Sequence, residues 1–294
     1  MKNYSRISII TSFLGLWIDS FFSNKIQLII GFILIFSFGI LHGANDLLLI
    51  KKINNEKSNN SYLQIITYYC MIIATSIALF YFIPWFALLL FILFSAYHFG
   101  EQHWDIENNL NHWFRRFFHF TYGIVLLFLL FTLKAEEVKN IIFSITNTQI
   151  PIIYFQKILY LFISFLGICF YLLFKKKIIS LNKIIKEVFH LFVFAIIFKV
   201  SELIWGFALY FVFWHSIPSI INQIIFIDGS LTIYNCIKYI KSAFLYWIIS
   251  LMGIFLFYYF LNETQIFSAV FFSFLAAITF PHVMVIFKMF DFKK

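Results

Sequence analysis

Long apolar stretches separated by short polar segments run along the whole chain. A transmembrane helix needs about 20 predominantly apolar residues, with a range of roughly 17 to 25. Stretches of about this length are residues 7–23, 26–50, 62–83, 84–100, 116–133, 154–174, 186–200, 203–227, 241–261 and 265–287. Because some are short and the first contains Asp19, the pattern predicts about nine or ten transmembrane helices. We therefore expect an all-α polytopic membrane bundle that forms a single integral-membrane domain over residues 1–294. Pro84 predicts a sharp turn between two of its helices.

Composition and charge support a membrane protein. Hydrophobic residues make up 62% of the chain and charged residues 12%, whereas about a quarter of the residues of a soluble domain are charged. The net charge of +9 raises the question of a nucleic-acid partner. If the segment ending at Ile50 exits to the cytoplasm and the spans alternate, seventeen of the 22 lysines and arginines fall on the cytoplasmic side. This asymmetry is typical of cytoplasmic loops, so we expect a lipid bilayer and no nucleic acid.

The segment Phe36–Leu47 places titratable groups inside a predicted span. On a continuous helix, His42 and Asp46 lie four residues apart and share one face. Gly39 and Gly43 repeat at the same spacing and allow a neighbouring helix or a ligand to approach closely. Since polar groups at membrane depth normally face the interior of a bundle and serve a function, this segment predicts a functional site.

Four histidines on four different segments fall at a similar predicted depth, toward the inner half of the membrane. These are His42, His98, His215 and His282. A single buried histidine is ordinarily a hydrogen-bonded core residue. Several imidazoles at this depth need partners, which a metal ion supplies. The other histidines are His103 and His112 in the polar loop Glu101–Asn111, His119 at the start of the next span, and His190 one turn inside its helix.

Imidazole ligands suit zinc, copper, iron or nickel. Thiolates are missing from these positions, because the three cysteines are scattered through apolar segments and show no metal-binding spacing. The neighbouring carboxylates are Asp46, Glu101 and Asp105. We expect Asp46 and Glu101 to orient imidazole rings or loop contacts, although Glu101 and Asp105 suit a solvated helix end equally well.

Four short motifs occur in a fixed order along the chain: His42-Gly43-Ala44-Asn45-Asp46, Tyr97-His98-Phe99-Gly100-Glu101, Trp214-His215-Ser216 and Pro281-His282. Together they resemble the Brp/Blh family, whose bacteriorhodopsin-related proteins act as β-carotene 15,15′-dioxygenases. The resemblance covers about residues 26–290.

The resemblance implies an iron(II)-dependent oxygenase that uses O2 to split the central 15,15′ double bond of β-carotene. It also implies two all-trans-retinal products that pass to a microbial rhodopsin, and a location in the bacterial inner membrane. The charge asymmetry of the loops predicts that the metal site lies toward the cytoplasmic half. His42, His98 and His215 match the family's catalytic iron ligands. The family has a further histidine four residues after His215, where this chain has Ser219. We expect His282 to be the fourth ligand, with His103 or an open position as alternatives.

Aromatic rings that flank the histidines predict a hydrocarbon channel for a long polyene. The candidates are Tyr97, Phe211 and Trp214, because such rings stack along a conjugated chain. The chain contains 44 phenylalanines, so packing or lipid contact is the ordinary alternative for any one ring.

Other functions remain open at this point. A b-type haem protein also uses intramembrane histidines, and a transporter uses His, Asp and Glu to relay protons or metal ions. A membrane di-iron desaturase or hydroxylase ranks last, because the sequence lacks its clustered HxxxH and HxxHH patterns. A retinal photoreceptor is disfavoured because no lysine lies at mid-span to form a Schiff base.

Overall fold

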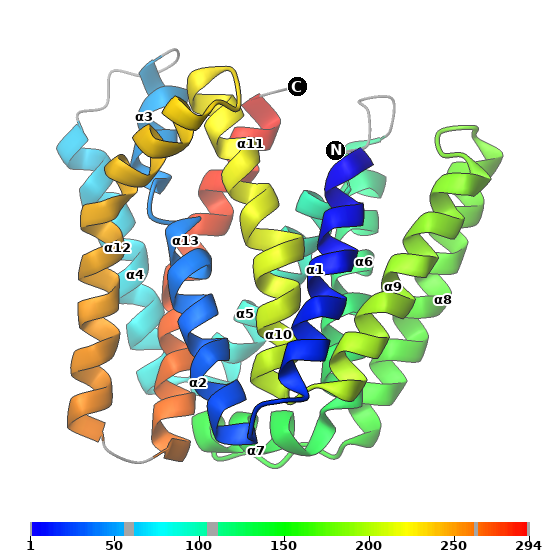
Figure 1. Cartoon of the computed structure of the whole chain (residues 1–294), viewed down its shortest axis with the longest axis horizontal. Helices are drawn as coiled ribbons and strands as arrows, with labels where there is room; N and C mark the ends of the chain where they lie inside the picture. The colour runs from blue at the N-terminus through cyan, green and yellow to red at the C-terminus, as the bar shows by residue number, and fades with distance from the viewer. Residues whose placement is uncertain (1, 56–61, 105–110, 262–263, 293–294) are drawn as a thin grey trace. The chain divides into compact units, whose positions relative to one another are not determined.

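The computed structural model describes residues 2–55, 62–104, 111–261 and 264–292, and every regular element among them is helical (Figure 1). The all-α prediction is therefore confirmed. The elements are α1 (Lys2–Asp19), α2 (Asn24–Leu34), the π-helical segment η1 (Ile35–Gly39), α3 (Asp46–Asn55), α4 (Tyr62–Phe82), α5 (Pro84–His103), α6 (His112–Leu133), α7 (Ala135–Thr146), α8 (Ile153–Lys175), α9 (Leu181–Val200), α10 (Leu203–Tyr210), the π-helical segment η2 (Phe211–Ser216), α11 (Ile217–Asp228), α12 (Ile233–Leu261) and α13 (Thr264–Phe292).

Seven helices in the described part of the chain are long and apolar enough to cross a membrane. Their ranges are Asn24–Ile53, Leu63–Phe82, Pro84–His103, His112–Leu133, Ile153–Lys175, Leu203–Asp228 and Val270–Phe290. The predicted spans 7–23, 186–200 and 241–261 also form helices, α1, α9 and α12, but these are not among the seven. In α9 the charges of Lys183, Lys186 and Glu187 lower the apolar character of its first turns. The larger predicted count of nine or ten stays a prediction.

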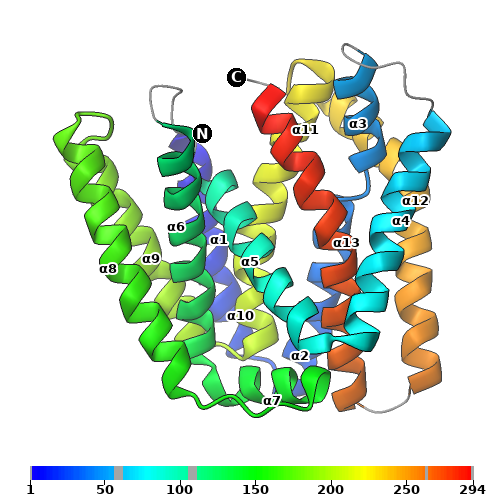
Figure 2. The ribbon, with the colours of Figure 1, turned by 180° about the vertical axis from the view of Figure 1, so that it is seen from behind.

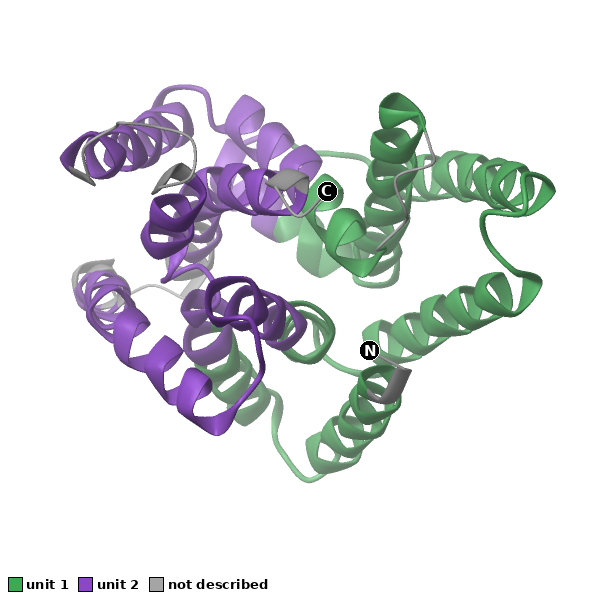
Figure 3. Cartoon of the chain, turned by 90° about the horizontal axis from the view of Figure 1, so that it is seen from above, with its two compact units in different colours: residues 1–35, 96–140, 149–215 green, residues 36–95, 141–148, 216–294 purple. Residues whose placement is uncertain are grey.

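The chain divides into two compact units, coloured separately in Figure 3. Unit 1 contains residues 1–35, 96–140 and 149–215. Within it, α6 packs against α8 and α9, while α10 packs against α2 and α9; the contact of α6 with α8 can be followed in Figure 2. Aromatic rings fill much of the core of this unit, including the fully buried side chains of Phe118, Tyr122 and Phe194.

Unit 2 contains residues 36–95, 141–148 and 216–294. Here α13 packs against α3, α4 and α12, and α11 packs against α3 and α12. A cluster of buried aliphatic side chains joins α3 to α13. Its members are Leu49, Ile53, Val285, Ile286 and Met289.

The predicted span 26–50 is not one continuous α-helix. It passes from α2 through η1 into a turn at residues 42–45, and α3 begins at Asp46. In this turn the amides of Gly43, Ala44 and Asp46 each donate to the carbonyl three residues earlier, at distances of 3.1–3.3 Å. The expectation that His42 and Asp46 share one continuous helical face is therefore wrong. Gly39 and Gly43 favour the break, because glycine destabilises the interior of a helix.

Other predicted boundaries also change. Pro84 begins α5 directly after α4 and Ile83, so the sharp turn is confirmed. His103 is the last residue of α5 and His112 the first of α6, so neither lies in an irregular loop as expected. The amphipathic helix α7 was not predicted, because its twelve residues are too short and too polar for a span. Asp105 lies outside the described residues.

Two glycines allow α5 and α6 to cross at very short range within unit 1. A methyl group added to Gly123 on α6 would overlap the backbone carbonyl oxygen of Ala96, and one added to Gly100 on α5 would overlap that of His119. His98 lies on α5 between these two contact points. The glycines therefore fix the position of the helix segment that carries His98.

We predict that Gly123→Ala lowers the free energy of unfolding by about 1–3 kcal/mol, because the methyl group must displace rigid backbone rather than a flexible side chain. Thermal unfolding of the purified chain in detergent measures this. Gly167→Ala on α8 is the matched control, since no described atom lies within 4 Å of its added methyl group. That control should leave stability unchanged or raise it by up to about 1 kcal/mol. Equal behaviour of the two variants would contradict the close crossing.

Candidate metal centre

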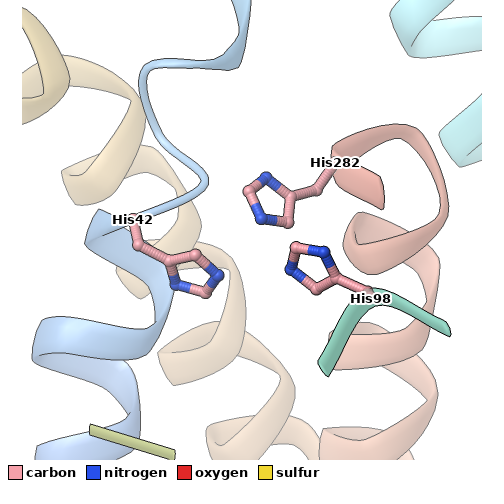
Figure 4. A group of neighbouring side chains, drawn as sticks. All are labelled: His42, His98 and His282. Atoms are coloured by element: carbon pink, nitrogen blue, oxygen red, sulfur yellow. The ribbon is translucent and has the colours of Figure 1, made fainter. Parts of the chain in front are cut away.

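A pair of buried histidines lies within unit 2. The ring centroids of His42 and His282 are 4.6 Å apart and the ring planes are nearly perpendicular. Figure 4 shows His42 beside the turn that follows η1, and His282 projecting from α13. Both side chains are about 5% exposed. The structure therefore brings two of the four candidate histidines together within this unit.

Asp46 fixes the orientation of the His282 ring. The Nδ1 atom of His282 lies 2.8 Å from Oδ1 of Asp46, and the hydroxyl of Tyr69 donates to Oδ2 of the same carboxylate at 2.9 Å. A carboxylate accepts hydrogen bonds, so Nδ1 of His282 carries the hydrogen of this bond, and Nε2 is the ring nitrogen that a metal would use. An imidazole oriented in this way by a carboxylate is a typical metal ligand.

A buried polar network supports the turn that carries His42. The side-chain amide of Gln223 on α11 donates to the His42 carbonyl oxygen at 2.8 Å. The hydroxyl of Tyr239 on α12 donates to Oε1 of Gln223 at 2.8 Å, and Asn45 donates to the Tyr239 carbonyl at 3.0 Å. Ser242 in turn donates to Oδ1 of Asn45 at 2.9 Å. Buried backbone groups require hydrogen-bond partners. The network supplies such partners where the turn lacks helical hydrogen bonds.

The roles of Gln223 and Tyr239 were not predicted from the sequence. Asn45 belongs to one of the four sequence motifs, but no role was predicted for it. A glutamine inside an otherwise apolar predicted span was the available signal. Gln223 also donates to the hydroxyl oxygen of Ser219 at 3.1 Å, one turn earlier on α11. Ser219 is therefore joined through one amide to the backbone of His42.

A second pair of buried histidines lies within unit 1. The ring centroids of His98 on α5 and His215 in η2 are 4.7 Å apart at an interplanar angle of 82°. The side chain of Gln102 donates to the His215 carbonyl at 3.1 Å. The Phe211 ring stacks on the His215 ring with centroids 5.3 Å apart, and both histidines are at most 2% exposed.

Local irregularities of the helices coincide with these histidines. His215 lies inside η2, and Pro218 follows it in the first turn of α11. Proline lacks the amide hydrogen that would bond the carbonyl of Trp214, four residues earlier, and a π-helical turn accommodates that loss. Pro281 similarly precedes His282 inside α13, and η1 precedes His42. Short π-helical segments are frequent at functional sites.

Glu101 lies on α5 one turn after Tyr97. The Tyr97 hydroxyl donates to Oε1 of Glu101 at 3.1 Å, and the carboxylate is only 5% exposed. The alternative of a solvated helix end is therefore wrong for Glu101, since the side chain is buried and hydrogen-bonded.

Each of the two pairs consists of imidazole side chains. Neither of the two groups of potential metal ligands among the described residues contains a cysteine. Imidazole nitrogens suit zinc, copper, iron and nickel. Buried imidazole pairs such as these are chemically suited to contribute ligands to a transition-metal ion.

Comparison with known proteins decides the family. The model of a family described as "Beta-carotene 15,15'-dioxygenase" matches residues 33–290, which is most of the chain. The chain belongs to the β-carotene 15,15′-dioxygenase family. No curated protein and no solved structure matched the chain in the same comparisons. Membership implies β-carotene 15,15′-dioxygenase activity, with a carotenoid and O2 as substrates.

The matched region of this β-carotene dioxygenase contains all four sequence motifs that predicted the family. The structure brings His42 together with His282, and His98 together with His215. The alternative ligand His103 is engaged elsewhere, because its Nε2 atom lies 2.7 Å from Oε2 of Glu187.

Of the three aromatic residues predicted to line the carotenoid channel, Phe211 stacks on the His215 ring. The Trp214 indole donates to Ser12 at 3.0 Å and packs against His190. The Tyr97 ring lies 6.2 Å from the ring of His119. The channel role of the three stays a prediction.

We predict that Gln223→Ala destabilises the β-carotene dioxygenase by about 1–3 kcal/mol, because it leaves buried groups of the network without their partner. Denaturant or thermal unfolding in detergent measures the change. Gln149→Ala removes an exposed glutamine outside the helices and should alter stability by no more than about 0.5 kcal/mol. A Gln223→Ala chain as stable as this control would show that the network does not support the turn.

Proposed function

We propose that His42, His98, His215 and His282 hold one iron(II) ion, and that the enzyme uses O2 to cleave the central 15,15′ double bond of β-carotene into two all-trans-retinal molecules. The observation that carries this proposal is the presence of two pairs of buried imidazoles in a chain of the β-carotene 15,15′-dioxygenase family.

The donor set fits iron. Neutral imidazoles bind iron(II), and no thiolate lies among these side chains to favour a zinc–thiolate or iron–sulfur site. When bound, iron supplies the redox chemistry with O2 that protein side chains lack. The chain's own contribution is to hold ligand nitrogens in place and to keep water away from them, since all four rings are at most 5% exposed.

His282 takes the place of the family ligand that Ser219 replaces. Its ring lies next to His42, and Asp46 holds it with Nε2 as the ligand atom. Asp46 and Glu101 are the carboxylates that orient the site. Ser219 instead accepts a hydrogen bond from Gln223 and helps to position the His42 turn. The hydroxyl therefore retains a supporting role without binding the metal.

The substrate is a long hydrocarbon, so it enters from the lipid bilayer. Tyr97, Phe211 and Trp214 line its channel, because aromatic faces stack on a conjugated chain. Helices α1, α9 and α12 cross the membrane in addition to the seven apolar helices, which gives ten spans, the upper value of the sequence prediction. The enzyme resides in the bacterial inner membrane with its metal toward the cytoplasmic half, and retinal passes to a microbial rhodopsin.

Expression in a bacterial host that already makes β-carotene tests the proposed activity. We expect the orange pigment to be lost and retinal to appear by chromatography in iron-supplied cells. His42→Ala should abolish both the bound iron and the retinal, because a buried ligand is removed. His112→Ala alters an exposed histidine and should behave like the unaltered chain.

Two outcomes would count against this function. Normal retinal production by a folded His42→Ala chain would show that His42 is not a ligand. Unchanged β-carotene in cells that contain folded, unaltered chain would favour a transporter or a haem protein instead. A Soret band in the purified protein would then identify the haem protein.

The Ser219→His variant tests the proposed exchange of ligands. Position 219 is linked through Gln223 to the His42 backbone, so an added imidazole would lie near the proposed centre. We expect retinal formation to persist and iron to be retained more tightly, as measured by metal analysis after dialysis against a chelator. Complete loss of activity in a folded variant would mean that the site cannot accommodate the family's ligand arrangement.

A further inference from the structure

We propose that His103, Glu187 and His190 form a second metal site that binds a divalent transition-metal ion such as Zn²⁺. This site lies within unit 1 and shares no ligand with the proposed iron centre. The proposal does not depend on the enzyme's reaction.

The spacing of the ligands supports the site. Glu187 and His190 are three residues apart on α9, in a Glu-x-x-His arrangement that places both side chains on one helix face. Helical bundles use the same arrangement to bind di-iron and di-manganese centres. His103, at the end of α5, supplies the third ligand. Two imidazoles and one carboxylate are a common donor set for divalent transition metals.

The distances between the ligand atoms suit a single ion. Oε2 of Glu187 lies 2.7 Å from Nε2 of His103 and 3.2 Å from Nδ1 of His190. The three ligand atoms all lie within 4.8 Å of one another. Metal–ligand bonds of about 2.0–2.2 Å place adjacent ligand atoms roughly 3 Å apart, so an ion could be bound with small side-chain movements.

The surroundings hold the ligands in place before metal binds. The His103 ring stacks on the Tyr122 ring with centroids 4.8 Å apart, and the His190 ring packs against Trp214 at 5.1 Å. Preorganised ligands lose little freedom when a metal binds. The site remains partly accessible, since the His103 side chain is 10% exposed.

The charge of Glu187 gives a reason for a cation. Its side chain is 8% exposed, and its ion-pair partners among the described residues are the two histidines. A buried carboxylate needs compensating positive charge. Without metal, both imidazoles can donate to Oε2 and form a hydrogen-bonded triad. When a metal ion is bound, the ion itself supplies the compensating positive charge. The metal-free and metal-bound states therefore differ by one bound ion per chain, which can be counted.

Titration of the metal-free, detergent-purified chain with Co²⁺ tests the site, with bound ions counted by equilibrium dialysis and followed by visible absorption. We expect the unaltered chain to bind one more ion than Glu187→Gln or His190→Gln, each of which removes one ligand. His112→Ala is the control and should bind as many ions as the unaltered chain. Because the readout is the difference between variants, it holds whether or not the proposed iron centre exists.

Equal numbers of ions in the unaltered chain and in a folded Glu187→Gln variant would overturn the proposal. Helix content by circular dichroism establishes which variants fold. A second measurement needs no substitution: bound Co²⁺ should block modification of His103 by diethyl pyrocarbonate, read by mass spectrometry, while exposed His112 stays reactive. Equal modification of His103 with and without Co²⁺ would also overturn the site.

Discussion

The cost of burying polar groups in an apolar protein governs the arrangement of this β-carotene dioxygenase. An imidazole or carboxylate removed from water must find hydrogen-bond or metal partners, and several buried polar groups near the histidine pairs have such partners. Asp46 receives hydrogen bonds from His282 and Tyr69. Gln223 bonds the carbonyl of His42. Hydrogen bonds thus link the buried polar side chains to one another, and these links help to fix the positions of the histidines.

Breaks in regular helix make that arrangement available. Within a regular α-helix the backbone amides and carbonyls bond one another, whereas a break leaves backbone groups that need other partners. At the turn after η1 the helix opens, and α11 and α12 supply the hydrogen bonds that hold it through Gln223 and Tyr239. At η2 a π-helical turn next to Pro218 carries His215. The proposed metal ligands are therefore carried on segments whose backbone departs from the ideal helix.

The sequence alone predicted the helical class and the family, and it grouped His42 and His282 among four candidate ligands, because apolar length and short motifs are local properties. It could not predict the turn after η1, since the same hydrophobic spacing is compatible with a continuous helix. It placed His103 in a loop, because the polar residues after α5 mask the end of the helix. The approach of His103 to Glu187, 84 residues away, depends on packing between helices, which hydrophobic periodicity does not encode.

The central claim is that histidine-bound iron enables this chain to cleave β-carotene at its centre. Incubating the purified chain with β-carotene and O2, first metal-free and then loaded with iron(II), and counting retinal by chromatography tests it most directly. We expect two retinal molecules for each β-carotene consumed by the iron-loaded chain, and no cleavage by the metal-free chain. Equal cleavage by the metal-free chain, or products of unequal length, would contradict it.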